Sequence, residues 1–249
     1  MPPEGKASVI IAAVDETATL PGVLAQAARL RPAEVIVVAN GPDDGVARIA
    51  AAAGARVIRH ARRVGHDVGR ALGAAAASGD TLLFLDADLP LAAGELLPFL
   101  QATAEGVDLA LNRIDPYIQP AARSHPVNAA KRFLTAVLQR PDLGYASLTA
   151  MPHALSRRAV EALGADALAV PPVALARAVQ AGLVVAAVHP VDVVGPNARR
   201  PGVNLGRSSP VEQLILGDHL EAVSWLLAQE RSSRGPFGDL GRQRDLLRQ

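Results

Sequence analysis

The regular alternation of apolar, β-branched runs with helix-like segments limits the possible folds of this chain more than any other feature of its sequence. Runs such as SVIIAAV and TLLFL are apolar at consecutive positions, which is typical of strands buried on both faces. The predicted strands of the first half cover residues 8–14, 34–39, 56–59, 81–85 and 107–111. The helices predicted between them cover residues 20–30, 46–53, 68–77 and 93–104. This alternation predicts an α/β fold with a Rossmann-like, mostly parallel sheet and helices on both faces.

The second half of the sequence is less regular. Its patterns predict a strand at 183–188 and helices at 128–138, 156–163, 175–181 and 212–229. In the last helix, an apolar stripe is predicted to face the core, formed by Leu216, Leu220, Val223 and Leu227. We expect an α/β half at residues 1–115, a smaller C-terminal lobe of the same domain at 116–230, and a polar tail at 231–249 that could dock on a neighbouring copy in a homodimer.

Composition excludes several classes of function. The chain has 249 residues and 50% hydrophobic content, enough for a sizeable core, and its net charge of +1 gives no reason to expect a nucleic-acid partner. It has no cysteine, so thiolate chemistry and Cys-ligated zinc are excluded. The most apolar later stretch, 165–194, is interrupted by prolines and Arg177, and the N-terminal MPPEGKAS lacks an apolar signal core. We therefore expect a cytoplasmic protein without an integral membrane segment.

The segment FLDADLP places two carboxylates, Asp86 and Asp88, directly after the predicted strand 81–85. At this spacing in an extended backbone, one carboxylate could bind Mg²⁺ or Mn²⁺ while the other contacts a ribose hydroxyl or a metal-bound water. A polar turn that closes a strand is the alternative, and by itself an Asp-x-Asp pair favours that alternative.

Four segments occur in the same order and spacing as the motifs of family 2 glycosyltransferases. They are SVIIAAVDE, EVIVVANGPDDG, RRVGHDVGRALGAAAASGD and TLLFLDADLP, and together they span about residues 7–115. The chain therefore resembles this family, whose members have the GT-A fold of the nucleotide-diphospho-sugar transferases. The resemblance implies a UDP- or GDP-linked sugar donor and a divalent metal, Mn²⁺ or Mg²⁺.

The resemblance also implies roles for individual residues in donor binding. Asp88 would bind the metal on the donor diphosphate, and Asp86 would contact ribose or help to hold the metal. Asp15 and Glu16 would lie near the nucleobase and ribose, and Arg70 beside the diphosphate; a helix cap for Asp15 and a solvent-facing position for Arg70 are the alternatives. Where the family has a base-contacting Asp at the end of its second strand, this chain has Ala39, and the next residue, Asn40, is the candidate substitute.

The chain departs from the family where inverting members carry a Glu-Asp pair whose Asp is the general base. The corresponding segment has Val170, Pro171 and Pro172, and no further acid before Asp192. Retaining GT-A enzymes lack a dedicated base and often add a late His as a metal ligand, so retention is favoured. This reasoning points to GDHLEA and makes Asp218, His219 and Glu221 catalytic candidates, with His219 as a metal ligand; a solvated helix face is the alternative.

The acceptor side is predicted from the segment 142–157 and from a basic loop. Tyr145, Ser147, Thr149 and His153 could contact acceptor hydroxyls. In the loop GPNARRPGVNLGR, Arg199 and Arg200 could grip an anionic acceptor or the diphosphate, because guanidinium groups bind phosphate with two hydrogen bonds, and a plain basic surface loop is the alternative.

We therefore expect a metal-dependent glycosyltransferase that moves a sugar from a nucleotide-diphosphate donor to an unidentified hydroxyl acceptor. Two alternatives stay open at this point. One is a nucleotide-sugar-binding protein without transferase activity, because Ala39 and the missing Glu-Asp pair depart from the family. The other is a nucleotidyltransferase, although AAVDETATLPG lacks the Gly-rich, basic loop that such enzymes carry after their first strand.

Overall fold

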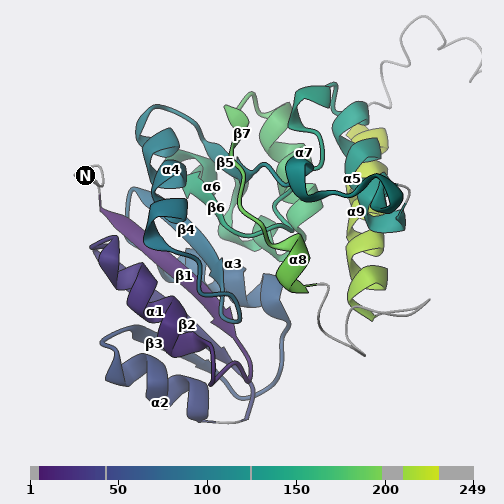
Figure 1. The fold of residues 1–249 in the computed structure, drawn as a ribbon. Coiled ribbons are helices and arrows are strands. Elements are labelled where there is room, and N and C mark those ends of the chain that lie inside the picture. Colours follow the sequence, from purple (N-terminus) through teal and green to yellow (C-terminus); the bar gives the residue numbers. More distant parts are fainter. Residues whose placement is uncertain (1–5, 43, 124, 198–209, 230–249) are drawn as a thin grey trace, which may run out of the picture.

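The computed structural model describes residues 6–42, 44–123, 125–197 and 210–229. Seven strands form one sheet in the order β3-β2-β1-β4-β6-β5-β7 (Figure 1). Their bounds are β1 Ala7–Ala13, β2 Glu34–Asn40, β3 Arg56–His60, β4 Thr81–Asp86, β5 Leu109–Asn112, β6 His153–Ser156 and β7 Val185–His189. β6 runs antiparallel to β4 and β5, and every other pair of neighbours is parallel. The prediction of a mostly parallel α/β sheet is confirmed.

Helices cover both faces of the sheet, as predicted. The α-helices are α1 Leu20–Arg29, α2 Gly45–Ala52, α3 His66–Ala76, α4 Ala93–Ala104, α5 Pro126–Val137, α6 Arg157–Leu163, α7 Pro171–Gln180, α8 Val194–Asn197 and α9 Pro210–Gln229. Four short 3-10 helices connect them: η1 Asp115–Tyr117, η2 Pro120–Ala122, η3 Pro141–Leu143 and η4 Ala165–Ala169. α1, α2 and α4 pack on one face, and α3, α5, α6, α7 and α9 lie on the other (Figure 1).

Two hydrophobic cores follow from the alternation of side chains along the strands. Val9 and Ile11 of β1 point into the core under α1, α2 and α4, whereas Ile10 points into the core under α3 and α7. All three side chains have no exposed surface. Because the strands are buried on both faces, their sequences are apolar without interruption, which is why they could be predicted from sequence.

α3 lies unusually close to β1 because two of its positions carry no side chain. A Cβ added to Gly73 would lie 2.5 Å from Cγ2 of Ile10, and one added to Gly69 would lie 3.0 Å from Cβ of Ala12. This close packing directs the N-terminal turn of α3, with Asp67 and Arg70, toward the carboxyl end of the neighbouring strands.

β6 was not predicted, and it changes how the two predicted halves join. It inserts between β4 and β5, where His153 pairs with Phe84 and Ala154 pairs with Ala110. Because β6 is antiparallel, it begins at the edge of the sheet where β4 and β5 end. The connection that precedes β6 therefore lies at this carboxyl edge, and residues of both halves share one sheet.

The predicted core-facing stripe of α9 is confirmed only in part, since Val223 packs against the core and Leu216 is partly buried. Leu220 and Leu227 are 70% and 63% exposed, whereas His219, Ala222 and Leu226 are buried against α5 and α7. α9 is apolar around most of its circumference, so its sequence pattern does not select one face, and packing against neighbouring helices decides the orientation.

Candidate active site

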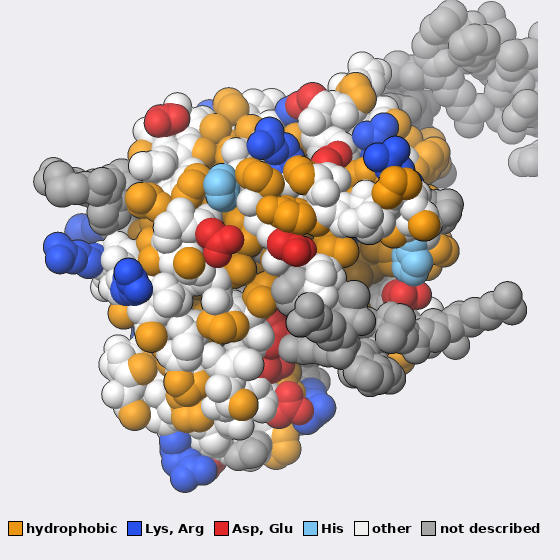
Figure 2. Space-filling model, viewed as in Figure 1, with side chains coloured by type: hydrophobic (Ala, Val, Ile, Leu, Met, Phe, Trp, Pro, Cys, Tyr) orange, Lys and Arg blue, Asp and Glu red, His pale blue; other side chains and the backbone are white. Residues whose placement is uncertain are grey.

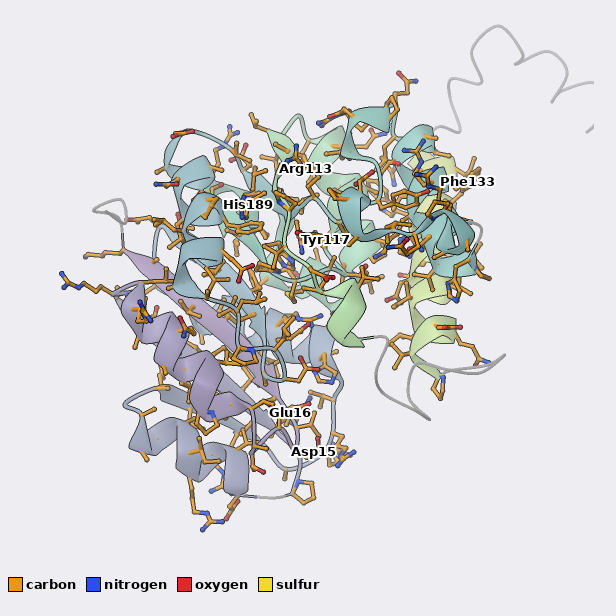
Figure 3. The ribbon with its side chains drawn as sticks, viewed as in Figure 1. Asp15, Glu16, Arg113, Tyr117, Phe133 and His189 are labelled. Atoms are coloured by element: carbon orange, nitrogen blue, oxygen red, sulfur yellow. The ribbon has the colours of Figure 1, made fainter. Side chains whose placement is uncertain are left out.

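Polar side chains gather at the carboxyl edge of the sheet, where ligands bind in α/β folds of this kind. Asp15 and Glu16 follow β1, and Asp86 ends β4. At the other side of the edge, Arg113 follows β5 and His189 ends β7. Figure 3 shows these two groups well apart, with Asp15 and Glu16 below and Arg113 and His189 above in that view. The edge is long enough to present two separate binding regions.

Arg70 connects α3 to the end of β4. Its Nη2 donates to Oδ1 of Asp86 at 2.6 Å, and its Nη1 donates to Oδ1 of Asp67 one turn earlier on α3. The Arg70 side chain is only 11% exposed. Burial by itself lowers the pKa of the guanidinium, but the two carboxylates more than offset that effect and raise it. Arg70 is therefore a fixed positive charge inside the site, and the solvent-facing alternative for this residue is excluded.

Asp86, Ala87 and Asp88 form a turn at the end of β4, here called the DAD turn. This turn suits a divalent metal only if a substrate completes the coordination. Asp86 and Asp88 flank the buried Ala87, whose carbonyl oxygen accepts a hydrogen bond of 2.9 Å from Oγ1 of Thr19. In the described ranges, no group of three or more His, Asp or Glu side chains could hold a metal ion. Two carboxylates without further protein ligands suit Mg²⁺ or Mn²⁺ when phosphate oxygens and waters supply the remaining ligands.

Asp15 and Glu16 occupy the loop after β1 in different ways. The Asp15 side chain is 70% exposed, and its Oδ2 lies 3.6 Å from Nη2 of Arg63. It does not cap α1, whose N-cap residue is Thr19. The Glu16 carboxylate folds back and accepts hydrogen bonds from the backbone N–H groups of Val14 and Asp15. Asp15 is therefore open to a ligand, whereas Glu16 shapes the loop.

Asn40 has a different task from the predicted contact with a nucleobase. Its side chain is buried, its Nδ2 donates to the Gly65 carbonyl at 2.7 Å, and its Oδ1 accepts from the Val64 N–H at 2.7 Å. Both ends of the amide are thus used to fasten the loop before α3 to the end of β2. This fastening holds the N-terminal turn of α3, which carries Asp67 and Arg70.

The predicted acceptor segment lies in the connection before β6, and its side chains differ in exposure. Ser147 is buried, and its Oγ accepts a hydrogen bond from the Thr149 N–H and lies 3.1 Å from the Thr149 Oγ1. The ring of Tyr145 lies under the guanidinium of Arg132 on α5, 5.4 Å from centroid to Cζ. Tyr145 and Thr149 are only partly buried, so their side chains, unlike that of Ser147, are accessible from solvent.

His153 is buried below this edge and does not reach it. Its ring packs against Phe84 with 5.0 Å between centroids. The pKa of His153 is lowered to about 3, mainly by burial and also by the nearby Arg70, while the Ala150 carbonyl and Asp86 partly offset these effects. His153 is neutral at physiological pH and supports the end of β4 from within the core.

The three candidates on α9 separate from one another. Asp218 is half-buried and faces α3, where burial, then Asp67, then Glu221 raise its pKa to about 6. His219 points into the core beside Lys131 of α5, and its Nδ1 bonds the Ile215 carbonyl at 2.6 Å. His219 does not join Asp86 and Asp88 in any cluster of metal-binding residues within the described chain, which argues against the predicted metal role. Glu221 is exposed, and only Asp218 approaches the charges of the site.

The segment that lacks the Glu-Asp pair begins α7. Pro171 and Pro172 are buried and Val170 is partly buried, so the start of α7 is apolar. The sequence has no Asp or Glu between Ala167 and Val191. This helix therefore offers no carboxylate that could serve as a general base.

Asn112, at the end of β5, connects two loops by hydrogen bonds, and this role was not predicted from the sequence. Asn112 is fully buried, and its Nδ2 donates to the carbonyls of Met151 and Val191 while its Oδ1 accepts from the Val191 N–H. It therefore ties the connection before β6 to the connection after β7. The only signal in the sequence is that Asn112 directly follows the predicted strand 107–111.

Arg199 and Arg200 lie outside the described residues, as does the tail 231–249. On the face shown in Figure 2, acidic and basic side chains are interspersed, and no extended basic surface is visible. None of the helices in the described ranges combines the length and the apolar character that a membrane crossing requires.

Fold and edge together define a nucleotide-diphospho-sugar transferase of the GT-A type. The sequence profile of glycosyl transferase family 2 matches residues 8–164. The chain belongs to this family and is a glycosyltransferase. Among curated proteins, none matches its sequence.

Solved structures of glucosyl-3-phosphoglycerate synthase from Mycobacterium tuberculosis are similar to this chain. One is 25% identical, with a TM-score of 0.61, and the match covers 90% of this chain and 80% of the other. A second, in complex with Mn²⁺, UDP and glucosyl-3-phosphoglycerate, is 24% identical with a TM-score of 0.62 and the same coverage. A third, with Mn²⁺, UDP-glucose and phosphoglyceric acid, is 20% identical with a TM-score of 0.63, over 89% of this chain and 80% of the other. These likenesses agree with the predicted GT-A fold.

Proposed function

We propose that this glycosyltransferase moves a sugar from a UDP-linked donor to a hydroxyl group of an anionic acceptor, with a divalent metal and with retention of anomeric configuration. The observation that carries the proposal is the Arg70–Asp86 ion pair at the end of β4, beside the DAD turn. A buried arginine next to two carboxylates provides the alternating charges that a metal–diphosphate group requires.

On the donor side, Asp86 and Asp88 would hold the metal, and Arg70 would lie beside the diphosphate. The metal, when bound, offsets the negative charge that develops on the departing nucleoside diphosphate. Asp15, which is exposed at the end of β1, is the candidate contact for ribose or base. Glu16 and Asn40 contribute by shaping the loops around that position. UDP is preferred to GDP because the similar synthases were solved with UDP or UDP-glucose.

On the acceptor side, Tyr145 and Thr149 would contact the acceptor, because they come from the connection that enters the same edge. The similar synthases bind phosphoglyceric acid, and a phosphorylated or carboxylated acceptor is the corresponding proposal here. Arg113, exposed after β5, and the predicted contacts Arg199 and Arg200 are the candidate partners for that negative charge.

Retention is proposed because the start of α7 offers no base. An inverting displacement needs a general base within hydrogen-bond reach of the acceptor hydroxyl. Asp218 is the remaining acid of the α9 candidates that faces the site, and its pKa of about 6 would allow it to exchange a proton near neutral pH. Its position toward Asp67 suits a supporting role near Arg70.

Two measurements test the proposal. Calorimetry with UDP should show binding that strengthens at least tenfold when Mn²⁺ is added, and no binding of UDP or GDP under either condition would contradict a nucleotide-sugar donor. Incubation with UDP-glucose and 3-phosphoglycerate should yield a product whose anomeric NMR coupling is that of an α-glucoside. A β-linked product would contradict retention, and turnover only with other acceptors would correct the acceptor class.

The other partner predictions are proposals with their own tests. The homodimer can be examined by light scattering of the purified chain, and the cytoplasmic location by cell fractionation. The division into a donor half at 1–115 and an acceptor half at 116–230 predicts that acceptor-specific variants fall after β5, at the last residues of the first half or in the second half.

A further inference from the structure

The carboxylate of Asp115 is enclosed by the backbone that begins the connection before β6. Its Oδ2 accepts a hydrogen bond of 3.2 Å from the backbone N–H of Tyr145. Gly144 lies directly over the same group, with a φ of +56°, and a Cβ at this position would be 2.1 Å from Oδ1 of Asp115. Position 144 can therefore carry no side chain while the backbone approaches this carboxylate.

Two side chains of α5 hold the same point from another side. Oγ1 of Thr135 donates to the Gly144 carbonyl at 3.2 Å. The guanidinium of Arg132 lies over the ring of Tyr145. The backbone of residues 144–145 is thus held between η1, which carries Asp115, and α5.

The far end of the connection is held by the residue that ends β5. Nδ2 of Asn112 donates to the Met151 carbonyl at 2.8 Å. Asn112 and Asp115 are three residues apart, so a single turn after β5 fixes both ends of residues 145–151. Tyr145 lies at the first of these two fixed points, and Thr149 lies between them. Both are proposed contacts of the acceptor.

We propose that Asp115 is a positioning residue for the acceptor: its carboxylate fixes the backbone at Gly144 and Tyr145 and thereby sets where residues 145–149 meet the acceptor. The inference rests on the proposed acceptor role of this segment. A carboxylate suits this task because a charged oxygen accepts a stronger hydrogen bond from a backbone N–H group than a neutral oxygen does. Asp115 acts through Tyr145 and takes no part in the proton transfer.

The first test reads the contact itself and does not depend on catalysis. The chain has two tyrosines, so selective ¹⁵N-tyrosine labelling gives two backbone amide signals, and Tyr145→Phe assigns them. Asp115→Ala should move the Tyr145 signal upfield and speed its hydrogen exchange at least tenfold, and Asp115→Asn, which keeps an acceptor oxygen, should leave exchange within about threefold of the wild type. An unchanged Tyr145 signal in Asp115→Ala would overturn the proposal.

The second test separates acceptor from donor. With UDP-glucose as donor and 3-phosphoglycerate as acceptor, Asp115→Ala should raise the acceptor KM about tenfold or more, because small displacements of positioning groups have large effects. UDP affinity in the presence of Mn²⁺ should stay within twofold, and Asp115→Asn should restore most of the acceptor KM. Asp80→Ala is the matched control and should leave the acceptor KM unchanged, since Asp80 is exposed and precedes β4 at the opposite edge of the sheet.

The outcomes distinguish this proposal from the proposed function. An unchanged acceptor KM in Asp115→Ala, or an equal loss of UDP affinity, would overturn the positioning role while the transferase reaction stands. If the wild-type chain binds UDP but does not use 3-phosphoglycerate, the acceptor class is wrong. In that case, the Tyr145 amide signal is followed during titration with 3-phosphoglycerate and with the acceptor found by screening. A shift of this signal with the true acceptor in the wild type, lost in Asp115→Ala, supports the positioning role of Asp115. No shift in the wild type overturns that role.

Discussion

Arg70 and Asp86 are joined by a hydrogen bond of 2.6 Å between Nη2 and Oδ1, although they come from different elements, α3 and β4. The pair brings a helix N-terminal turn and the DAD turn into one charged unit, which Asp67 extends on the α3 side. Because the Arg70 side chain is only 11% exposed, we expect the pair to stabilise the edge of the sheet, in addition to its proposed role in donor binding.

Replacing Arg70 should therefore affect stability and binding together. We expect Arg70→Gln to lower the free energy of unfolding by about 2–3 kcal/mol, because it leaves two partly buried carboxylates without their cation. Arg70→Lys keeps the charge but cannot bridge both carboxylates, so its loss should be smaller. Urea unfolding and UDP calorimetry measure the two effects, with Arg59→Gln as an exposed control whose side chain is 62% exposed. Wild-type stability in Arg70→Gln would contradict this account.

Asp88 should determine how strongly donor binding depends on metal. In Asp88→Asn, addition of Mn²⁺ should strengthen UDP binding by less than a third of the factor measured for the wild type, since a neutral amide is a poor ligand for a hard cation. The thermal midpoint shows whether the variant is folded. Asp44→Asn, at an exposed acid that pairs with Arg59, is the control and should bind as the wild type does. The same metal dependence in Asp88→Asn and in the wild type would return Asp88 to a structural role.

The raised pKa of Asp218 predicts a pH-dependent cost in stability. Its folded-state pKa of about 6 lies above the ordinary value of 3.8, so the ionised form destabilises the folded chain. The cost is absent below pH 3.8, grows as the pH rises toward 6 and is complete above it. Since Asp218 is only half-buried, screening reduces the cost to about 1 kcal/mol.

The comparison of Asp218→Asn with the wild type tests this expectation. The variant should be more stable by about 1 kcal/mol at pH 7.5 in urea unfolding, and the difference should vanish near pH 4. Glu161→Gln, an exposed acid on α6, is the control and should show no such dependence. A difference that is the same at both pH values would show that Asp218 does not carry the effect.

Lys131 is the second titrating position, and it lies in the α5–α9 interface beside His219. Burial lowers the pKa of Lys131 from 10.5 to about 8. The ammonium form is therefore disfavoured in the folded chain, with the full cost below pH 8 and none above pH 10.5. Lys131→Met, which has a similar length and no charge, should raise the free energy of unfolding at pH 7 by about 2 kcal/mol.

This gain should shrink in unfolding measurements at pH 10. Lys6 is the only other lysine in the chain and is exposed, so Lys6→Met is the matched control. A stability loss in Lys131→Met at pH 7 would show that the ammonium has a favourable partner in the interface.

Two helical glycines should respond to alanine in opposite directions. Gly73→Ala should destabilise the chain by about 1–3 kcal/mol, because its Cβ would overlap Ile10 of β1. Gly217→Ala on α9 meets nothing within 4 Å and should stabilise the chain by up to about 1 kcal/mol through helix propensity alone. Thermal unfolding of the two variants compares them directly. A stable Gly73→Ala variant would mean that α3 can move away from the sheet without loss.

The buried parallel strands could be predicted because their apolar runs contain the required information locally. The predicted strands 34–39 and 81–85 differ from β2 and β4 by a single residue at the end. β6 escaped prediction because HALS is short and its place depends on pairing with Phe84 and Ala110, which are distant in sequence. The predicted helix 175–181 begins four residues after the start of α7, whose first turn contains Pro171 and Pro172 at positions where proline needs no N–H partner.

In the site, residue types could be predicted better than side-chain directions. Arg70 contacts Asp86 of the DAD turn, and the order of the motifs places these two residues in neighbouring segments. Asn40 and His219 turn inward instead, because the loop before α3 and the packing of α9 against α5 fix their orientation. Asn112 and Asp115 were missed because their hydrogen-bond partners lie about 30–80 residues away in sequence.

The antiparallel insertion of β6 has a consequence for how such enzymes diversify. Strands β1 to β4 and α3 build the Arg70–Asp86 unit without any residue from the connections on either side of α5. Those connections can therefore change, outside the positions held by Asn112 and Asp115, while the Arg70–Asp86 unit is preserved. Under the proposed function, chains with this fold could keep the same donor site while they transfer the sugar to different acceptors.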